Sequence, residues 1–185
     1  MKDLIKIEEV QNIEKLENEY DFEKASLLDR KLRLIVKERP ELKSIRKKLR
    51  RLMSDYEEQV WLETDKVPDD LVSESDKAVQ IIETERRFLK KRKETIRKKL
   101  KDYDITQQDL GILLGHPKSY ISELMNGISQ FTMKDLVIIH RLFGVNLKTL
   151  IPTYLQSDTR EKINDTISKL NKPKLKLRKK DLVTE

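Results

Sequence analysis

Residues 105–151 have the sequence ITQQDLGILLGHPKSYISELMNGISQFTMKDLVIIHRLFGVNLKTLI, which contains all four glycines of the chain. Thr106 with Asp109, and Thr132 with Asp135, have the spacing of capping boxes, in which a hydroxyl and an acid each bond a free amide at a helix start. Three glycines stand where a helix end needs a left-handed residue. We therefore predict helices over 106–114, 117–126, 132–143 and 147–151. The three glycines are Gly115, Gly127 and Gly144.

The apolar residues between these signals predict a small all-helical core. Ile96, Leu100 and Tyr103 have the spacing of a preceding helix that packs on the same core. The other positions expected to point inward are Ile105, Leu110, Leu113, Leu114, Ile121, Leu124, Met125, Leu136, Ile139, Phe143, Val145 and Leu150.

Two short helices joined by a glycine turn indicate a helix-turn-helix, whose second helix enters the major groove of DNA. The inward residues of that second helix leave Lys118, Ser119, Ser122 and Glu123 facing outward as candidates for reading bases. Lysine donates to guanine O6 and N7, serine donates or accepts, and glutamate accepts from cytosine N4. The alternative for Glu123 is a surface salt bridge to Lys118 or a neighbour.

Four parts of this stretch resemble the Xre family of helix-turn-helix proteins, and in particular its HigA-type antitoxin branch. They are ITQQDLGILLG, PKSYISELMNG, the Thr132 cap and HRLFGVNLKTLI. The resemblance implies a five-helix, lambda-repressor-like DNA-binding domain over residues 94–152.

The resemblance also implies roles for single residues. The positions of Lys118, Ser119 and Glu123 are the usual base readers of the family, and the position of Gln107 clamps a phosphate. Tyr120 either stacks against a sugar or thymine methyl or covers the edge of the core. Gln108 is a further candidate for DNA contact.

The sequence departs from the family after Gly127, where relatives often carry a basic pair and this chain has Ile128, Ser129 and Gln130. The Ser129 hydroxyl remains a candidate for phosphate contact. Residues 86–101 carry ten bases and one acid, so the expected phosphate contacts shift to this block, namely to Arg92, Lys93 and Arg97. The alternative is that the block is an ordinary solvated helix face. Asp104, where relatives often have glycine, is a milder change because aspartate tolerates the left-handed region.

Residues 1–63 are expected to form an N-terminal helical domain. Asn18 can cap a helix over 19–37, and Pro40 separates it from a second helix over 41–63, which together predict an antiparallel pair. Tyr56–Trp61 resembles the end of the partner-binding domain of HigA-type antitoxins, or holds simple core aromatics. Residues 1–17 fit either a helix or a short strand.

Residues 64–93 are expected to hold an acidic linker and the first part of a long, basic connecting helix over 77–102. Ile82, Leu89, Ile96 and Tyr103 step by seven, so this stripe pairs with a second copy of the chain or packs within the chain. Residues 52–85 carry eleven acids and two bases, which suits a basic partner.

Residues 153–185 are expected to hold a C-terminal helix capped by Asp158, with Ile163, Ile167 and Leu170 on one face. The basic segment 171–180 that follows is expected to be disordered; the alternatives are a disordered arm that lies along DNA and an edge strand for a partner.

Composition excludes several functions. The chain of 185 residues has a net charge of +7, no cysteine and two histidines, His116 and His140. This composition argues against a metal site and suits a polyanionic partner. We expect His140 to be a packed structural residue. No nucleophile with an adjacent base, no phosphate-binding glycine loop and no apolar run of about 20 residues is present. We therefore expect an all-α cytoplasmic protein that is not an enzyme and has no catalytic residue, cofactor, membrane contact or small-molecule substrate.

The resemblance implies a type II antitoxin, whose N-terminal helices neutralise a small basic ribonuclease toxin of the HigB type. A homodimer would bind double-stranded operator DNA and repress its own operon. The alternatives are a stand-alone Xre-family transcriptional regulator and a helical scaffold that has lost DNA binding.

Overall fold

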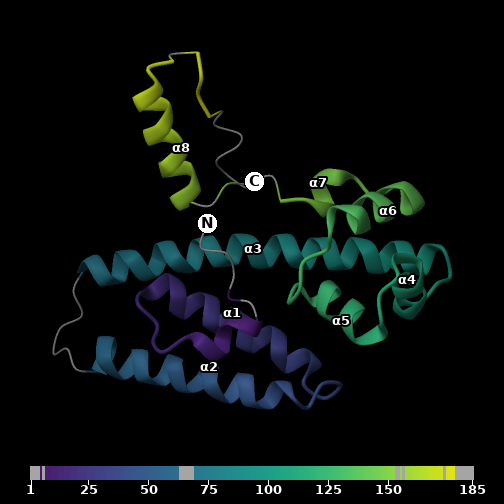
Figure 1. Ribbon diagram of the computed structural model, residues 1–185, viewed down its shortest axis with the longest axis horizontal. Helices are drawn as coiled ribbons and strands as arrows, with labels where there is room; N and C mark the ends of the chain where they lie inside the picture. The colour runs from purple at the N-terminus through teal and green to yellow at the C-terminus, as the bar shows by residue number, and fades with distance from the viewer. Residues whose placement is uncertain are drawn as a thin grey trace.

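The computed structural model describes residues 5, 7–62, 69–152, 155, 157–172 and 174–177. These residues form helices, with no strand among them, as the predicted all-α class requires. The longest helix, α3 (Asp69–Asp102), runs the length of the molecule, with α1 (Glu19–Ile35) and α2 (Leu42–Glu57) along one side (Figure 1). Four short helices cluster at its C-terminal end. They are α4 (Gln107–Leu114), α5 (Lys118–Asn126), α6 (Met133–Phe143) and α7 (Leu147–Leu150).

The local signals of the C-terminal domain act as predicted. Both capping boxes are formed, at Thr106 with Asp109 and at Thr132 with Asp135. The three helix-ending glycines, Gly115, Gly127 and Gly144, are all left-handed, with φ of 75°, 68° and 62°.

The C-terminal core is built around Ile96, Leu110, Ile121, Leu124 and Ile139. The predicted inward position of Leu113 is wrong, because its side chain is 49% exposed. α4 buries Leu110, Gly111 and Leu114 instead, and Leu113 falls outside that face at 3.6 residues per turn. Phe131, in the loop before α6, is buried although no helical periodicity marks it.

The N-terminal helices have a core of their own, built from Val10, Leu28, Leu32, Leu49 and Tyr56 among others. The Asn18 side chain caps α1 by accepting from the Asp21 amide at 2.9 Å, as predicted. The Tyr56 hydroxyl donates to Glu19 Oε1 at 3.1 Å, which confirms Tyr56 as a core aromatic; the Trp61 side chain lies outside the described residues.

The ends of this N-terminal part differ in detail from the prediction. Residues Ile7–Asn12 form a 3-10 helix, η1, so the strand alternative is wrong for them. At the other end, α2 continues into a π-helical turn, η2 (Glu58–Leu62).

α3 begins at Asp69, eight residues before the predicted start at 77, so the segment 69–76 is helix and not linker. Asp69 stands at the first position of the helix, where an acidic residue interacts favourably with the positive end of the helix dipole. Ile82 and Ile96 of the seven-residue stripe are buried within the chain, and Tyr103 is exposed. The alternative of packing within the chain is therefore confirmed for Ile82 and Ile96.

The last described helix, α8 (Ser157–Leu170), begins one residue before Asp158, the predicted cap. It projects away from the other helices in Figure 1. Ile163 and Ile167 are half-buried, and Leu170 is exposed. Of the basic arm, residues 174–177 are not in a strand, and residues 173 and 178–180 lie outside the described residues.

Candidate nucleic-acid interface

α4 and α5 form the two helices of the predicted motif. Gly111 lies at their crossing, where an added Cβ would stand 2.9 Å from the His116 carbonyl oxygen. His116 belongs to the turn between α4 and α5, and its amide donates to the Gly111 carbonyl oxygen at 2.8 Å. Pro117, with φ of −68°, then leads directly into Lys118 at the start of α5. A tight turn thus holds the second helix in place.

The first turn of α5 faces outward. Lys118 and Ser119 are exposed, and Ser122, one turn further on, is half-buried. In a helix-turn-helix, the N-terminal residues of the second helix meet the base edges. Gln107, at the start of α4, is half-buried and Gln108 is exposed. The DNA contacts of these five residues remain predictions, and their placement is compatible with them.

The predicted outward position of Glu123 is wrong. Its side chain is only 6% exposed, and its carboxylate forms an ion pair with Arg39, from the loop between α1 and α2. The Ser129 hydroxyl donates to the second carboxylate oxygen at 2.7 Å. Because both oxygens are engaged inside the protein, Glu123 is not placed to accept from a cytosine. Ser129 is likewise turned toward Glu123 rather than toward a phosphate.

The C-terminal end of α5 is docked on the N-terminal helices. Lys31 of α1 is buried, and its Nζ donates to the Gly127 carbonyl oxygen at 2.9 Å. Burial lowers the pKa of Lys31 to about 8, and the neighbouring Glu85 carboxylate opposes that shift. Ile128 packs against the N-terminal core. The apolar residue that replaces the basic pair of the resembled family is therefore an internal contact between the two helical parts.

Gly127 also fits tightly against α3. A Cβ at this position would stand 2.9 Å from Leu89 Cδ1, and the φ of 68° is a value that side chains with a Cβ rarely adopt. Lys31 of α1 and Leu89 of α3 thus contact the end of α5, and Ile128, in the loop after α5, packs against the N-terminal core.

Two of the three residues on α3 that were predicted to contact phosphate are turned toward partners inside the protein. Arg92 is 8% exposed, and its guanidinium lies over the Phe88 and Phe131 rings at 5.4 and 5.2 Å. Lys93 is half-buried, and its Nζ donates to Asn126 Oδ1 at 2.5 Å. Burial lowers the pKa of Lys93, and the charge of Arg97 adds to this effect. Arg97 itself is exposed, so its phosphate contact remains a prediction.

His116 joins the turn before α5 to the start of α6. Its Nε2 lies 3.0 Å from Asp135 Oδ1, and its ring meets the Tyr120 ring edge-on at 5.0 Å. Tyr120 is half-buried against the C-terminal core, so it covers the core edge. His140 Nδ1 lies 2.8 Å from the Val145 carbonyl oxygen, which confirms a packed structural role.

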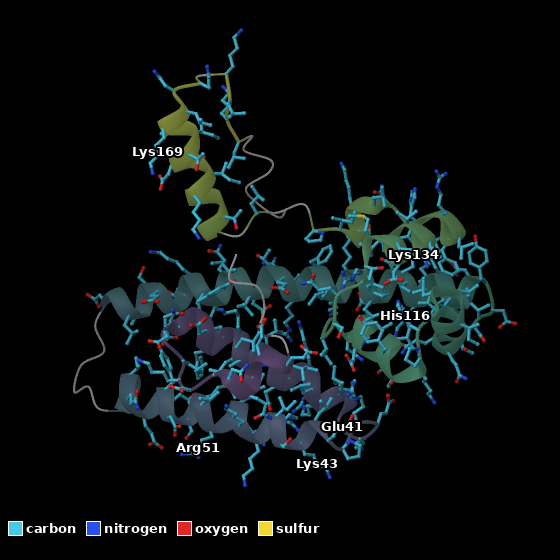
Figure 2. All side chains as sticks on the ribbon, viewed as in Figure 1. Glu41, Lys43, Arg51, His116, Lys134 and Lys169 are labelled. Carbon is cyan, nitrogen blue, oxygen red and sulfur yellow. The ribbon has the colours of Figure 1, made fainter. Side chains whose placement is uncertain are left out.

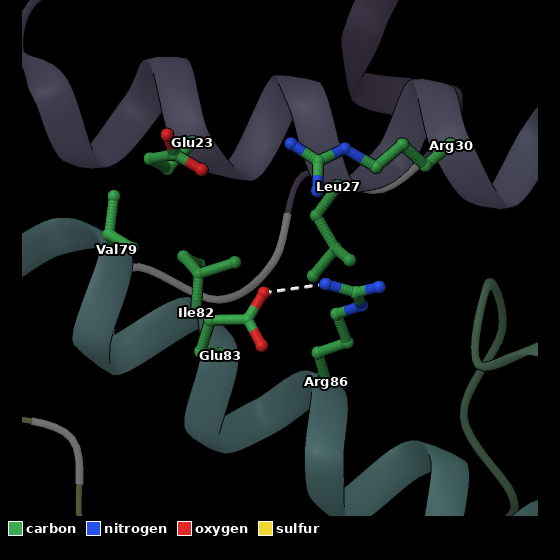
Figure 3. A pocket seen from close by; sticks show the side chains of 7 residues that line it. All are labelled: Glu23, Leu27, Arg30, Val79, Ile82, Glu83 and Arg86. Atoms are coloured by element: carbon green, nitrogen blue, oxygen red, sulfur yellow. Dashed lines mark hydrogen bonds and ion pairs between the residues drawn. The ribbon is translucent and has the colours of Figure 1, made fainter.

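A small cavity of about 230 Å³ lies between α1 and α3 (Figure 3). Glu83 and Arg86, which pair at 2.7 Å, form one wall, and Glu23 and Arg30 of α1 form the other. Burial raises the pKa of Glu23. The volume is below the roughly 300–1,000 Å³ typical of small-molecule sites. Among the described residues, no three His, Asp or Glu side chains are grouped closely enough to hold a metal ion.

Residues 96–150 match the family described as Helix-turn-helix. The match begins at the buried Ile96 of α3 and ends at the buried Leu150 of α7, so it covers the C-terminal core and leaves α1, α2 and α8 outside. No curated protein and no solved structure matches the chain. None of the helices in the described residues is long and apolar enough to cross a membrane.

Proposed function

We propose that this chain, whose residues 96–150 match the helix-turn-helix family, is a transcriptional regulator that binds operator DNA. The observation that supports it most is the exposed first turn of α5, held by a tight turn in a domain of that family. Lys118 and Ser119 there have no acidic partner among the described residues. We propose a binding function and no catalytic one.

Recognition would divide between two kinds of contact. Lys118 would donate to guanine O6 and N7 in the major groove, and Ser119 would donate or accept beside it. Gln107 would bind a phosphate at the start of α4, which fixes the register of α5 without reading sequence. If two copies bind, their half-sites would lie about 34 Å apart, one turn of the duplex. Because Ile82 and Ile96 are buried within the chain, we propose that any dimer uses a different surface.

The test is binding to the DNA upstream of the protein's own coding sequence, measured by fluorescence anisotropy against a scrambled duplex of equal length. We expect tighter binding to the upstream DNA, by tenfold or more, which is about 1.4 kcal/mol. The matched control is Lys162→Ala, which removes one exposed lysine from α8 and should leave the preference unchanged. Equal binding of the two duplexes by the wild-type protein would refute a sequence-specific regulator.

A finer proposal is that the regulator is also the antitoxin of a HigB-type ribonuclease toxin. The resemblance in sequence supports it, as does the separate core of α1 and α2, which gives the N-terminal helices a surface of their own. The acidic segment 52–85 suits a basic partner. Co-expression with a neighbouring gene for a small basic protein should give a complex that survives purification, and rescue of cell growth. Independent purification of the two proteins would leave the stand-alone regulator.

A further inference from the structure

The loop before α2 and the first part of α2 form the most basic exposed surface of the N-terminal helices. Residues 37–51 carry eight bases and two acids, a balance of +6. A positive surface of this density attracts a polyanion whatever its sequence. Its location outside residues 96–150 means that the family match says nothing about it.

Three lysines in this segment are free to bind a ligand. Lys37, Lys43 and Lys47 are exposed, and none has an ion pair or hydrogen bond with another described residue. Lys43 and Lys47 are one turn apart on α2, so they share its outer face, while Leu42 and Leu49 are buried on the inner face. By contrast, Arg46 is held by both oxygens of Asp29, at 2.9 and 3.1 Å.

This lysine face is fixed next to α5. Arg39, which lies between Lys37 and Lys43 in the chain, forms the ion pair with Glu123 of α5. In addition, the buried hydrogen bond from Lys31 Nζ to the Gly127 carbonyl oxygen joins α1 to the end of α5. Glu41 and Lys43 lie at the end of α1 and α2 that is nearest the helix-turn-helix domain, in which His116 is labelled (Figure 2). A ligand on α5 would therefore lie near Lys37 and Lys43.

Around the helix-turn-helix domain, two of the three bases on α3 that were expected to bind phosphate are engaged inside the protein. The loop after α5 carries Ile128 in place of a basic residue, and it points into the N-terminal core. Arg92 and Lys93 are committed to Phe131 and Asn126. Affinity for DNA depends on neutralised phosphates, so bases on the N-terminal helices would supply phosphate contacts that Arg92 and Lys93 do not.

Resting on the proposed function, we propose that Lys37, Lys43 and Lys47 bind the phosphate backbone of the same duplex that α5 reads. The N-terminal helices then extend the DNA-binding surface. An acidic protein is the other ligand of matching charge. DNA is favoured because the lysines are held beside the recognition helix.

The test compares Lys43→Gln/Lys47→Gln with wild type on a duplex of arbitrary sequence, about 30 base pairs long, at a series of salt concentrations. Each lost phosphate contact lowers the slope of log K against log salt by about 0.9, so the double variant should lose about two units of slope. At 0.1 M salt its affinity should fall roughly tenfold to a hundredfold. The loss should be equal on the upstream DNA, because phosphates carry no sequence information.

The control is Lys77→Gln/Lys162→Gln, which removes the same charge from exposed positions on α3 and α8. Lys77 lies near the N-terminal end of α3, opposite the end that carries α4 and α5 (Figure 1). This control should keep the wild-type slope. All three proteins should have the same helical content and melting temperature, because the changed side chains are exposed.

An unchanged slope in Lys43→Gln/Lys47→Gln, while the wild type still prefers the upstream DNA, would overturn this inference and leave the proposed function intact. Tighter binding by the variant would overturn it too, because Lys43 and Lys47 would then oppose DNA binding. Absence of DNA binding by the wild type would overturn the proposed function and this inference together.

Discussion

Lys31→Met should abolish a rise in stability that the wild-type protein is expected to show between about pH 7 and about pH 10. Lys31 joins α1 to the end of α5, and burial lowers the pKa of its amine from 10.5 to about 8. The folded protein therefore releases this proton near pH 8, whereas the unfolded chain holds it until about pH 10.5. Between these values the unfolded state binds more protons, so the free energy of unfolding rises with pH.

The size of the effect follows from the shift. The fall of the Lys31 pKa from 10.5 to about 8, at about 1.36 kcal/mol per pKa unit, corresponds to roughly 3 kcal/mol of unfolding free energy, of which roughly 2 to 3 kcal/mol appears by about pH 10. The neutral amine still donates to the Gly127 carbonyl, so the docking contact persists. Lys31→Met has no proton to release and should lack this rise.

The assay is urea unfolding at both pH values, followed by circular dichroism. Burial and the Glu19 carboxylate raise the pKa of Tyr56, which lowers stability as pH rises past about 10. Both proteins share that effect, so the difference between them isolates Lys31. Parallel pH profiles for wild type and variant would refute the buried position of Lys31, and with it the docking of α1 on α5.

Gly127→Ala should lower the free energy of unfolding by about 2 kcal/mol or more, because Gly127 has a positive φ and is in close contact with Leu89. Gly115→Ala should lower it by about 1 kcal/mol, because Gly115 has a positive φ but an added Cβ would have no heavy atom within 4 Å. Equal melting temperatures for the two variants would contradict the contact with Leu89. Thr132→Ala removes the side-chain cap of α6 and should cost about 1 kcal/mol in urea unfolding. A loss below about 0.3 kcal/mol would mean that the cap is not formed. Ile96→Ala should lower the free energy of unfolding by roughly 2–5 kcal/mol, because Ile96 is almost fully buried where α3 meets the C-terminal core. A near-neutral result would place Ile96 at the surface.

The sequence predicted those features that depend on neighbours in the chain. A capping box such as Thr106 with Asp109 depends on residues only three apart, and the helix end at Gly115 depends only on the backbone conformation of that residue. Both features were therefore predictable from the sequence. The apolar stripes of α1 and α2 likewise follow helical periodicity. Leu113 shows the limit of this logic, because the approach of α5 at Gly111 set the inward face of α4.

The contacts across the two helical parts were beyond the sequence because they join distant residues. Lys31 and Gly127 are 96 positions apart, and no local pattern marks either as a partner of the other. The same holds for Arg39 and Glu123, because Glu123 was predicted to read bases and instead forms an internal ion pair with Arg39. One signal was present, since Ile128 stands where the resembled family carries a base. An apolar residue at a position expected to contact phosphate indicates that the position packs against another part of the protein.

The most direct test of DNA recognition by α5 is selection of preferred binding sites from a pool of random duplexes, using wild type and Lys118→Ala. We predict that the wild type selects a defined sequence, and that the variant loses discrimination at one base pair of each half-site by about 1–3 kcal/mol. The remaining positions should stay the same. Selection of the same sequence with the same discrimination by both proteins, or of no defined sequence by the wild type, would contradict the placement of Lys118 in the major groove.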